Sequence, residues 1–382
     1  MIGPLSWIEV SREALLHNWR LFALQAGPER VLLPVLKANA YGHGLELVAR
    51  ILAGEGQRWF GVHSAEEAEA LIALPDLADP RILVLSAVPA DRIPALVAGG
   101  VRLTVIDLPG LEEAAGAAEA AGIDVPVHLK LETGVNRQGL RAEELEAAAA
   151  LLDRSPRLVL EGLHSHFANI EDTTDHSYAR AQMERFAAMR ARLAELGHTP
   201  RLAHASCSAA AILFPETHHD LLRLGISLYG HWPSRETRVS AQAAGRNRLD
   251  LRPALTWKAR IVQIKHVDAG AYVGYGCTWK AEAPTRIGVL PVGYYDGYDR
   301  GLGGAHVLVR GRRAPVRGRV MMNLTLVDLG HVPEAERGDE AVLIGSQGDE
   351  RVSAEQLAEQ AGTINYEILA RLGSHLRRVE TA

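Results

Sequence analysis

Lys37 is the residue in this sequence best placed to act as a nucleophile. It ends the apolar run 31–36 and precedes three turn-forming residues, Asn39, Gly42 and Gly44. A short apolar run bounded by Gly and Asn is typical of a buried strand, so the Lys37 amine is expected at the carboxyl end of that strand. Burial there disfavours the ammonium and favours a nucleophilic amine, as Schiff-base chemistry requires. A surface lysine in a strand-to-helix loop is the ordinary alternative.

The chain around this lysine alternates short apolar runs with helical stretches. After a first strand at 5–10 and a helix at 11–26, the pattern predicts eight strands, at 31–36, 59–63, 81–85, 101–106, 125–131, 158–164, 201–205 and 221–228. Helices are predicted at 45–54, 66–74, 91–99, 111–121, 142–152, 178–196 and 208–213. Eight strand–helix alternations favour an α/β fold with a closed (β/α)8 barrel of the TIM type. A doubly wound open sheet is the alternative, but no Gly-rich nucleotide fingerprint follows the first strand.

The pattern changes near Trp232. Residues 233–253 are polar and Arg-rich, which predicts a linker or a long loop. Short β-branched runs follow at 256–267, 285–292, 306–309, 314–320, 325–329 and 340–344, with one helix at 353–361. These runs predict a mostly β domain. We therefore predict a barrel at 1–235 and a β-rich C-terminal domain at 236–382.

The bulk composition is that of an ordinary globular protein. Of 382 residues, 47% are hydrophobic and 23% charged, and the net charge of −5 includes no block of Lys and Arg. Nucleic acid and membrane surfaces are therefore not expected as partners. Two distant cysteines and the absence of a recognisable signal peptide favour a cytoplasmic location.

Polar residues with catalytic potential follow several of the predicted strands. They are Lys37, Lys130, Arg137, His164, His166, His204, Ser208 and Arg223. In a barrel the carboxyl ends of the strands form the active face, so these residues should converge on one mouth. Ser208 opens a predicted helix, where it could help to seat an anion or act simply as an N-cap.

The segment VLKANAYGHG at 35–44 resembles the lysine segment of the alanine racemases, which use pyridoxal 5'-phosphate (PLP). Further similar segments are HLKLETGVNRQG at 128–139, LLRLGISLYG at 221–230, VGYG at 273–276, PVGYYDG at 291–297 and GRVMMN at 318–323. The resemblance covers residues 5–371. It implies a PLP-binding barrel, a β domain to which the first strand could pair, and interconversion of L- and D-alanine that supplies D-alanine for peptidoglycan.

The resemblance also implies a cofactor site. Its residues would be Lys37, Tyr41, Leu85, His166, Ser208, Arg223, Gly225, Ile226 and Tyr366. Arg223 would face the pyridine nitrogen. Because arginine stays protonated, it would donate to an unprotonated ring nitrogen and weaken the ring as an electron sink, which favours racemisation over transamination.

Two acid–base groups on opposite faces of the substrate are implied by the same resemblance. Lys37 would serve one face and Tyr275, from the other subunit of a head-to-tail homodimer, the second face. A chain of His166, Arg223 and His204 would support the tyrosine. Substrate binding would fall to Arg137, Met322 and Tyr294, and Lys130 corresponds to a lysine that is often carbamylated.

Four positions depart from the family pattern, and several alternatives remain open. Cys207 stands where Asn is usual, Glu132 where Asp is usual, Val135 where Met is usual and Asn323 where Asp is commoner. A racemase of broader specificity, for example for serine, would have the same fold. A metal-dependent hydrolase could use His164 and His166 with a carbamylated Lys130. A PLP-binding carrier and a PLP-dependent decarboxylase share the barrel, but the first lacks a β domain and the second typically supplies a cysteine in place of the tyrosine.

Overall fold

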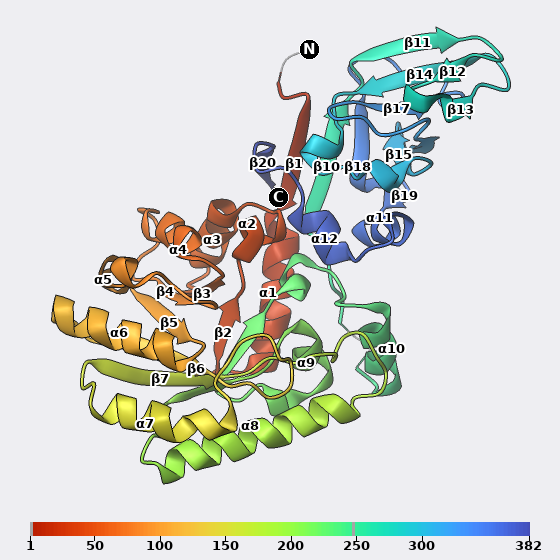
Figure 1. Ribbon diagram of the computed structural model, residues 1–382. Helices are drawn as coiled ribbons and strands as arrows, with labels where there is room; N and C mark the ends of the chain where they lie inside the picture. Colours follow the sequence, from red (N-terminus) through yellow and green to blue (C-terminus); the bar gives the residue numbers. More distant parts are fainter. Residues whose placement is uncertain (1–2, 247–248) are drawn as a thin grey trace. The chain divides into compact units, whose positions relative to one another are not determined.

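The computed structural model describes residues 3–246 and 249–382 and divides into two compact units (Figure 1). The first, here called the β unit, comprises Met1–Glu13, Ala38–Leu47 and Ala254–Ala382. The second, the barrel unit, comprises Ala14–Lys37 and Val48–Pro253. The chain thus passes from the barrel unit to the β unit directly after Lys37 and returns ten residues later.

Eight parallel strands form the centre of the barrel unit. They are β2 (Val31–Pro34), β3 (Trp59–Val62), β4 (Arg81–Val84), β5 (Val101–Val105), β6 (Val125–Lys130), β7 (Leu158–His164), β8 (Leu202–His204) and β9 (Leu221–Leu224). Strands β3 to β8 pair in sequence order, and β2 pairs with β9. A parallel bridge between Val35 and Gly61 joins β2 to β3. The predicted (β/α)8 barrel is confirmed.

One helix precedes β2 and the others follow individual strands, and these helices lie outside the strands (Figure 1). The helices are α1 (Arg12–Ala26), α3 (Leu45–Ala53), α4 (Ala65–Ile72), α5 (Ile93–Ala98), α6 (Leu108–Ala121), α7 (Leu145–Asp153), α8 (Ser177–Glu195) and α9 (Ser208–Leu213). Local sequence explains several of their ends. Ser64 and Glu67 form a capping box on α4, and Asp107 caps α6, which ends at Gly122 in the left-handed conformation. Each helix in the part of the chain that the structure describes is too short or too polar to cross a bilayer.

The prediction of a linker or long loop at 233–253 is wrong for its first half. Residues Arg235–Ala243 form helix α10, and the Ser234 hydroxyl accepts a hydrogen bond from Thr237 N at 2.9 Å. The helix buries only Thr237 and Ala241, so its apolar periodicity is weak. Residues 247 and 248 of the same prediction lie outside the described residues.

The last predicted strand of the barrel is also shorter than expected. It ends at Leu224, and Ile226–Tyr229 forms a 3-10 turn. The turn ends at Gly230, whose φ is 86° and where a Cβ atom would lie 1.9 Å from Arg252 O. Only glycine fits this conformation and this close approach, which direct the chain away from the strand.

The β unit contains a large mixed sheet and two small ones. The large sheet has the order β16-β15-β18-β10-β1-β20, with β19 paired to β18. Its strands are β1 (Ser6–Ser11), β10 (Leu255–Arg260), β15 (His306–Val309), β16 (Arg312–Pro315), β18 (Glu340–Gln347), β19 (Glu350–Val352) and β20 (Arg377–Thr381). Strand β1 pairs antiparallel with β10 and parallel with β20, so the N-terminal strand belongs to this unit.

The remaining elements of the β unit carry its loops. One small sheet contains β11 (Gln263–Val267), β14 (Thr285–Leu290) and β17 (Thr325–Asp328), and the other is the hairpin of β12 (Tyr272–Val273) and β13 (Trp279–Lys280). The single run predicted at 256–267 is therefore two strands, β10 and β11, in different sheets. Buried Ile261 lies between them. Helices α11 (Ala354–Ala361) and α12 (Asn365–Ala370) precede β20, and Ser353 caps α11 as part of a capping box.

Candidate active site

Lys37 opens a short left-handed turn, α2 (Lys37–Tyr41). The next four residues, Ala38 to Tyr41, all have φ between 51° and 54°. For residues with a Cβ atom this conformation costs about 1–2 kcal/mol each, so the surroundings must stabilise it. Asn39 Oδ1 accepts a hydrogen bond from Leu45 N at 2.8 Å, which ties the turn to the start of α3.

Contacts within the β unit hold the end of this turn. A Cβ atom on Gly42 would lie 2.0 Å from Leu369 O, so no other residue fits there. The Arg378 guanidinium donates to Gly42 O from Nε and Nη2, at 3.1 and 3.0 Å. The rings of Tyr41 and Tyr366 lie 6.1 Å apart. Tyr41 and Tyr366, both expected at the cofactor site, are thus neighbours within one unit.

In the barrel unit, four cations influence one another electrostatically. Burial lowers the pKa of Lys37, and the nearby charges of Arg137 and Arg223 lower it further. Burial also lowers the pKa of Lys130, to about 8, again with contributions from Arg137 and Arg223. Lys130 Nζ donates to Gln138 Oε1 at 3.2 Å. Both lysines therefore reach the neutral, nucleophilic form at a lower pH than an ordinary lysine.

Glu132, one of the four departures from the family pattern, organises the loop that carries Arg137. Its carboxylate accepts hydrogen bonds from Gly134 N at 2.5 Å and from Arg137 N at 3.2 Å. Burial raises the pKa of Glu132, but these backbone donors outweigh it and the net shift is downward. The longer acidic side chain thus stays ionised and bonded to its loop.

A buried polar network supports this loop from helix α8. Gln182 Nε2 donates to Thr133 Oγ1 at 3.2 Å and to His166 O at 3.0 Å, and its Oε1 accepts from Ala168 N at 2.9 Å. Thr133 and Ser165 share a hydroxyl hydrogen bond of 2.6 Å. Gln182 therefore links the Arg137 loop to the segment that carries His166.

Arg223, at the end of β9, makes hydrogen bonds through both of its terminal nitrogens. Its Nη1 donates to His204 Nδ1 at 2.5 Å, and its Nη2 donates to Ser165 O at 2.7 Å and Ala205 O at 2.9 Å. Burial lowers its pKa to about 10, so the guanidinium is still protonated at neutral pH. The side chain has no carboxylate among these partners, and its charge is stabilised by carbonyl and imidazole acceptors.

Three histidines are influenced electrostatically by this guanidinium. Burial holds the pKa of His164, His166 and His204 well below the usual value, and the charge of Arg223 adds to the effect. The ring of His164 stacks on that of His204, with 4.8 Å between centroids and 3° between planes. Across residues 3–246 and 249–382, no three His, Cys, Asp or Glu side chains are grouped so as to hold a metal ion.

Ser208 begins α9 and faces the turn after β9. Its hydroxyl accepts hydrogen bonds from Gly225 N at 3.1 Å and Ser227 N at 3.3 Å. Ser206 Oγ is buried and has no hydrogen-bond partner within the described residues. Cys207, between the two serines, is a thiol whose pKa burial raises to about 11. The segment therefore offers two hydroxyls and adjacent amides, with a neutral residue between them.

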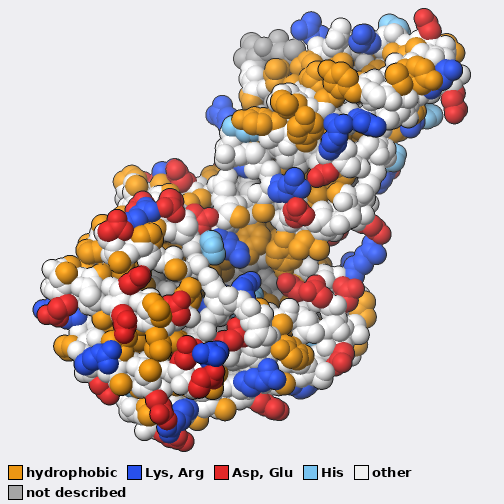
Figure 2. Space-filling view, in the orientation of Figure 1, with side chains coloured by type: hydrophobic (Ala, Val, Ile, Leu, Met, Phe, Trp, Pro, Cys, Tyr) orange, Lys and Arg blue, Asp and Glu red, His pale blue; other side chains and the backbone are white. Residues whose placement is uncertain are grey.

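The other predicted site residues lie on loops of the β unit. Tyr275 is 71% exposed, Met322 57% and Tyr294 40%, and hydrophobic side chains are visible on the surface of this unit (Figure 2). The loops of Tyr294 and Met322 are joined, because Tyr294 N donates to Met321 O at 2.9 Å and Tyr295 N to Met322 O at 3.0 Å. A Cβ atom on Gly293 would lie 2.1 Å from Met321 O, so this contact requires glycine.

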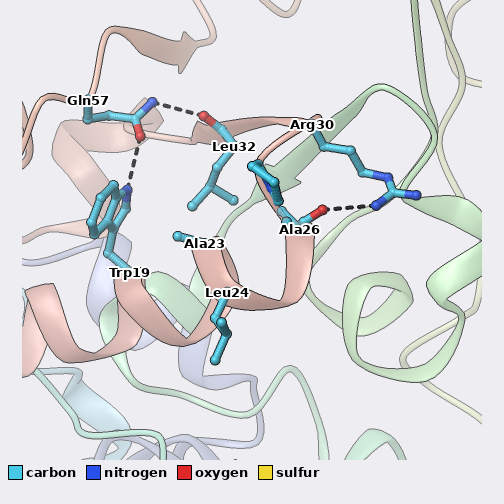
Figure 3. Close-up of a pocket in the computed structure, with 9 residues that line it drawn as sticks. Trp19, Ala23, Leu24, Ala26, Arg30, Leu32 and Gln57 are labelled. Carbon is cyan, nitrogen blue, oxygen red and sulfur yellow. Dashed lines mark hydrogen bonds between the residues drawn. The ribbon is translucent and has the colours of Figure 1, made fainter.

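A surface pocket of about 410 Å³ lies elsewhere in the barrel unit (Figure 3). Trp19 Nε1 donates to Gln57 Oε1 at 3.0 Å, and Gln57 Nε2 donates to Leu32 O at 2.8 Å. Leu32 is near the start of β2, whereas Lys37 follows its end. The pocket therefore lies at the amino ends of the strands, away from the candidate catalytic residues.

Some residues of the site were not foreseen from the sequence. Gln138, Gln182, His128 and Glu161 make hydrogen bonds to residues that were predicted, directly or through one intermediate. The sequence gives one signal for His128, which lies two residues before Lys130 on the same predicted strand and so faces the same side. Leu85, expected at the cofactor, follows β4 and donates from its backbone N to Val62 O at 2.8 Å.

The barrel unit carries Lys37, whose pKa burial lowers, at the end of one strand, and the β unit carries the exposed Tyr275. Polar groups at the carboxyl ends of barrel strands are the architecture of a (β/α)8 barrel enzyme. Comparison with known proteins agrees. The family model for the alanine racemase N-terminal domain matches residues 10–233, and the model for the alanine racemase C-terminal domain matches residues 254–380. The chain belongs to the alanine racemase family, whose members are isomerases.

Individual relatives span nearly the whole chain. An alanine racemase from Leptospira interrogans is 36% identical over 386 aligned positions, which cover 98% of this chain and 95% of the relative. One from Syntrophobacter fumaroxidans is 39% identical and covers 96% and 95%. Among solved structures, alanine racemase from Bacillus anthracis with bound L-Ala-P superposes with a TM-score of 0.92 at 31% identity, covering 100% of this chain and 96% of that one.

Proposed function

We propose that this protein interconverts L- and D-alanine, using PLP bound through Lys37 and a two-base mechanism. The observation that carries the proposal is the lysine itself. Its amine has a pKa lowered by burial, and it lies in the electrostatic field of Arg137 and Arg223 at the end of a barrel strand. A nucleophilic amine near two cations suits an aldehyde cofactor that also carries a phosphate.

The donor set of the barrel unit fits PLP. The Lys37 amine can bond its aldehyde carbon, and Ser208 with the Gly225 and Ile226 amides can bind its phosphate. The unpartnered Ser206 hydroxyl offers one further donor in the same segment. His166 and Leu85 remain predicted neighbours, as do Tyr41 and Tyr366 for the phosphate. When bound, the cofactor withdraws electrons from the amino-acid α-carbon and so acidifies its proton.

Arg223 would set the character of this electron withdrawal. Two of its nitrogens are already held by His204 Nδ1, Ser165 O and Ala205 O, so the plane of the guanidinium is fixed. Because it remains protonated, it can donate to the pyridine nitrogen but cannot accept a proton from it. A ring that stays unprotonated is a weaker electron sink, which favours return of the proton to the α-carbon.

Arg137 would bind the substrate carboxylate, and Lys130 would lie beside it. With a pKa of about 8, about a tenth of Lys130 is uncharged at pH 7. Such an amine can add to CO₂ and lose a proton, which gives a carbamate anion. We propose this modification because it replaces repulsion between Lys130 and Arg137 with attraction. A Lys130 that shows no added mass in intact-protein spectra and no added density in a crystal would exclude it.

Tyr275 would act as the second base from a partner subunit. It lies on the β unit and is largely exposed, as are Met322 and Tyr294, which we propose as residues at the substrate entrance. An exposed group of apolar side chains on one unit suits burial against a second copy of the chain. The proposed assembly is a head-to-tail homodimer in which each Tyr275 serves the partner's Lys37.

The proposed role is cytoplasmic supply of D-alanine for peptidoglycan. Solved relatives include alanine racemase from Clostridium difficile in complex with cycloserine and the Bacillus anthracis structure with L-Ala-P. These ligands belong to those proteins, and they support an amino-acid-sized site here only through the family relationship.

A spectroscopic and chiral assay tests the proposal. Purified protein is titrated with PLP while the visible absorbance is recorded, and is then incubated separately with L-alanine, L-serine and L-lysine. We expect a visible band that saturates at one cofactor per chain, and D-alanine formed faster than D-serine or D-lysine. Faster turnover of serine would identify the broader-specificity alternative. A colourless protein that forms no D-amino acid would refute the proposal.

A further inference from the structure

A line of hydrogen bonds continues from Arg223 into the interior of the barrel. Arg223 Nη1 donates to His204 Nδ1 at 2.5 Å, and His204 Nε2 lies 2.8 Å from His128 Nδ1. His128 Nε2 lies 3.2 Å from Glu161 Oε2, which also accepts from Arg102 Nε at 3.1 Å. The line crosses four strands, β9, β8, β6 and β7, and ends on β5 at Arg102.

Each proton position in this line follows from the two ends. An arginine can only donate, so His204 Nδ1 must carry a lone pair and His204 Nε2 must carry the proton. His204 Nε2 then donates to His128 Nδ1, which leaves the proton of His128 on Nε2. That proton is donated to the Glu161 carboxylate, which can only accept. Every donor therefore points away from Arg223 toward Glu161.

Burial is consistent with neutral imidazoles along the line. Both rings are fully buried, and burial lowers the pKa of His128 and of His204. The Glu161 hydrogen bond opposes this for His128 without reversing it. Two neutral rings thus separate a buried cation from its nearest hydrogen-bonded anion.

The local sequence makes room for this arrangement. His128 pairs with Gly162 across β6 and β7, and a Cβ atom on Gly162 would lie 2.3 Å from His128 Nδ1. Any residue other than glycine would push the ring out of the line. Barrel interiors are usually filled by layers of Val, Ile and Leu, so a continuous polar line through this one needs a reason.

We propose that His128 and Glu161 are positioning residues that fix the tautomer of His204 and thereby the orientation of Arg223. The inference rests on the proposed function, in which Arg223 faces the cofactor nitrogen. A carboxylate that accepts the His128 proton makes each successive nitrogen a better acceptor, so the far charge strengthens the Arg223–His204 bond. Arg223 is then held as a rigid donor, although the Glu161 carboxylate is itself paired with Arg102 at 3.1 Å and Arg201 at 3.7 Å.

Nuclear magnetic resonance on cofactor-free protein tests the tautomers directly. With ¹⁵N-labelled histidine, assigned by single substitutions, His128 and His204 should both show protonated Nε2 and unprotonated Nδ1. The histidine nitrogen signals should be the same even if the protein proves to have no racemase activity. This result therefore tests the tautomers independently of the proposed function. A proton on His204 Nδ1, or an imidazolium at either residue, would overturn the proposal.

Two substitutions at Glu161 distinguish the effect of its hydrogen-bond acceptor from the effect of its negative charge. Glu161→Gln keeps an acceptor oxygen, so both tautomers should persist, while loss of the charge should lower kcat of the PLP-loaded enzyme by about tenfold. Glu161→Leu removes the acceptor, so His128 and His204 should show mixed tautomers and kcat should fall by about a hundredfold. KM for alanine should change less than kcat in both, because Arg223 is not proposed to bind the substrate carboxylate.

Glu119→Leu is the matched control. Glu119 is exposed and paired with Arg157 at 3.8 Å, so the same chemical change there should alter neither tautomers nor kcat. Should Glu161→Leu fail to fold, Glu161→Gln still decides the matter. If Glu161→Gln has the same kcat as the unmodified protein, the inference is overturned. The proposal that the protein is a racemase would not be affected by that result.

Discussion

The interior of the barrel and the exposed loops of the β unit contribute to the proposed site in opposite ways. In the barrel, Arg223 and His204 are at most 5% exposed, and hydrogen bonds fix the position of both side chains. On the β unit, Tyr275 and Met322 are more than half exposed, and they lie on short turns. The barrel side chains are held by hydrogen bonds within the barrel, whereas those of the β-unit loops are exposed to solvent.

This difference shows which parts of the chemistry a single chain can prepare. Buried polar groups must satisfy one another, so the barrel fixes protonation states and orientations before any ligand binds. An exposed phenol can hydrogen-bond to water, so the fold of its own chain does not fix its orientation or protonation state. Under the proposed mechanism, the second base gains its environment only when another surface covers it.

The largest expected effect on this comparison of barrel and β unit comes from removing Lys37, the nucleophile of the barrel. Lys37→Ala should lower racemisation by about 10⁴-fold or more, because it removes both the cofactor bond and one acid–base group. The visible band should disappear. Lys265→Ala, on an exposed strand position, is the control and should leave both unchanged. Substantial turnover in Lys37→Ala would mean that the barrel does not supply the first base.

The corresponding change on the β unit should have a smaller effect of a different kind. Tyr275→Phe should lower kcat by about 10²- to 10³-fold while cofactor content stays normal, because only proton transfer at one face is lost. Deuterium exchange from solvent into the two enantiomers should become unequal. Tyr272→Phe, on the same hairpin, should behave like the unmodified protein. Equal slowing of deuterium exchange into the two enantiomers would argue for a single base.

Mixing the two inactive variants tests whether the tyrosine comes from a partner. Random dimers of Lys37→Ala and Tyr275→Phe chains should recover about a quarter of full activity, since half are mixed and each mixed dimer has one intact site of two. If Tyr275 serves the Lys37 of its own chain, no recovery occurs.

The buried cations of the barrel also predict a pH-dependent stability. The pKa of Lys130 is lowered from 10.5 to about 8 on folding, so the unfolded chain binds more protons between these values. Stability should therefore rise with pH from about 8 to about 10.5, by up to about 3 kcal/mol. Urea midpoints in CO₂-free buffer measure this. Lys130→Met should flatten the rise, and an identical slope in that variant would contradict the assignment.

The smallest expected effect concerns the left-handed turn that follows Lys37. Ala38 is exposed and has φ of 53°, so Ala38→Gly should raise stability by about 1 kcal/mol. Ala150→Gly, at an exposed position in α7, should lower it by about 1 kcal/mol. Changes of opposite sign in the thermal stability of the two variants would show that the turn after Lys37 is strained. A loss of stability in both would show that it is not.

The sequence was most informative where chemistry and local pattern coincide. The period of apolar runs predicted all eight barrel strands, and the Lys37 segment predicted the family that the comparisons confirm. Prediction failed where pattern was weak. Helix α10 buries only two side chains, and the bend at Ile261 carries no glycine or proline to mark the change of sheet.

By itself, the sequence determined the number and order of the barrel strands and the place of Lys37 at the end of the first of them. It did so because burial of an apolar strand and the turn-forming residues after it are local properties. Only the tertiary structure decided that His204 meets His128, 76 residues away, and that Glu161 ends the line. Such pairings depend on which strands become neighbours and how their side chains fill the barrel, and no local pattern encodes that.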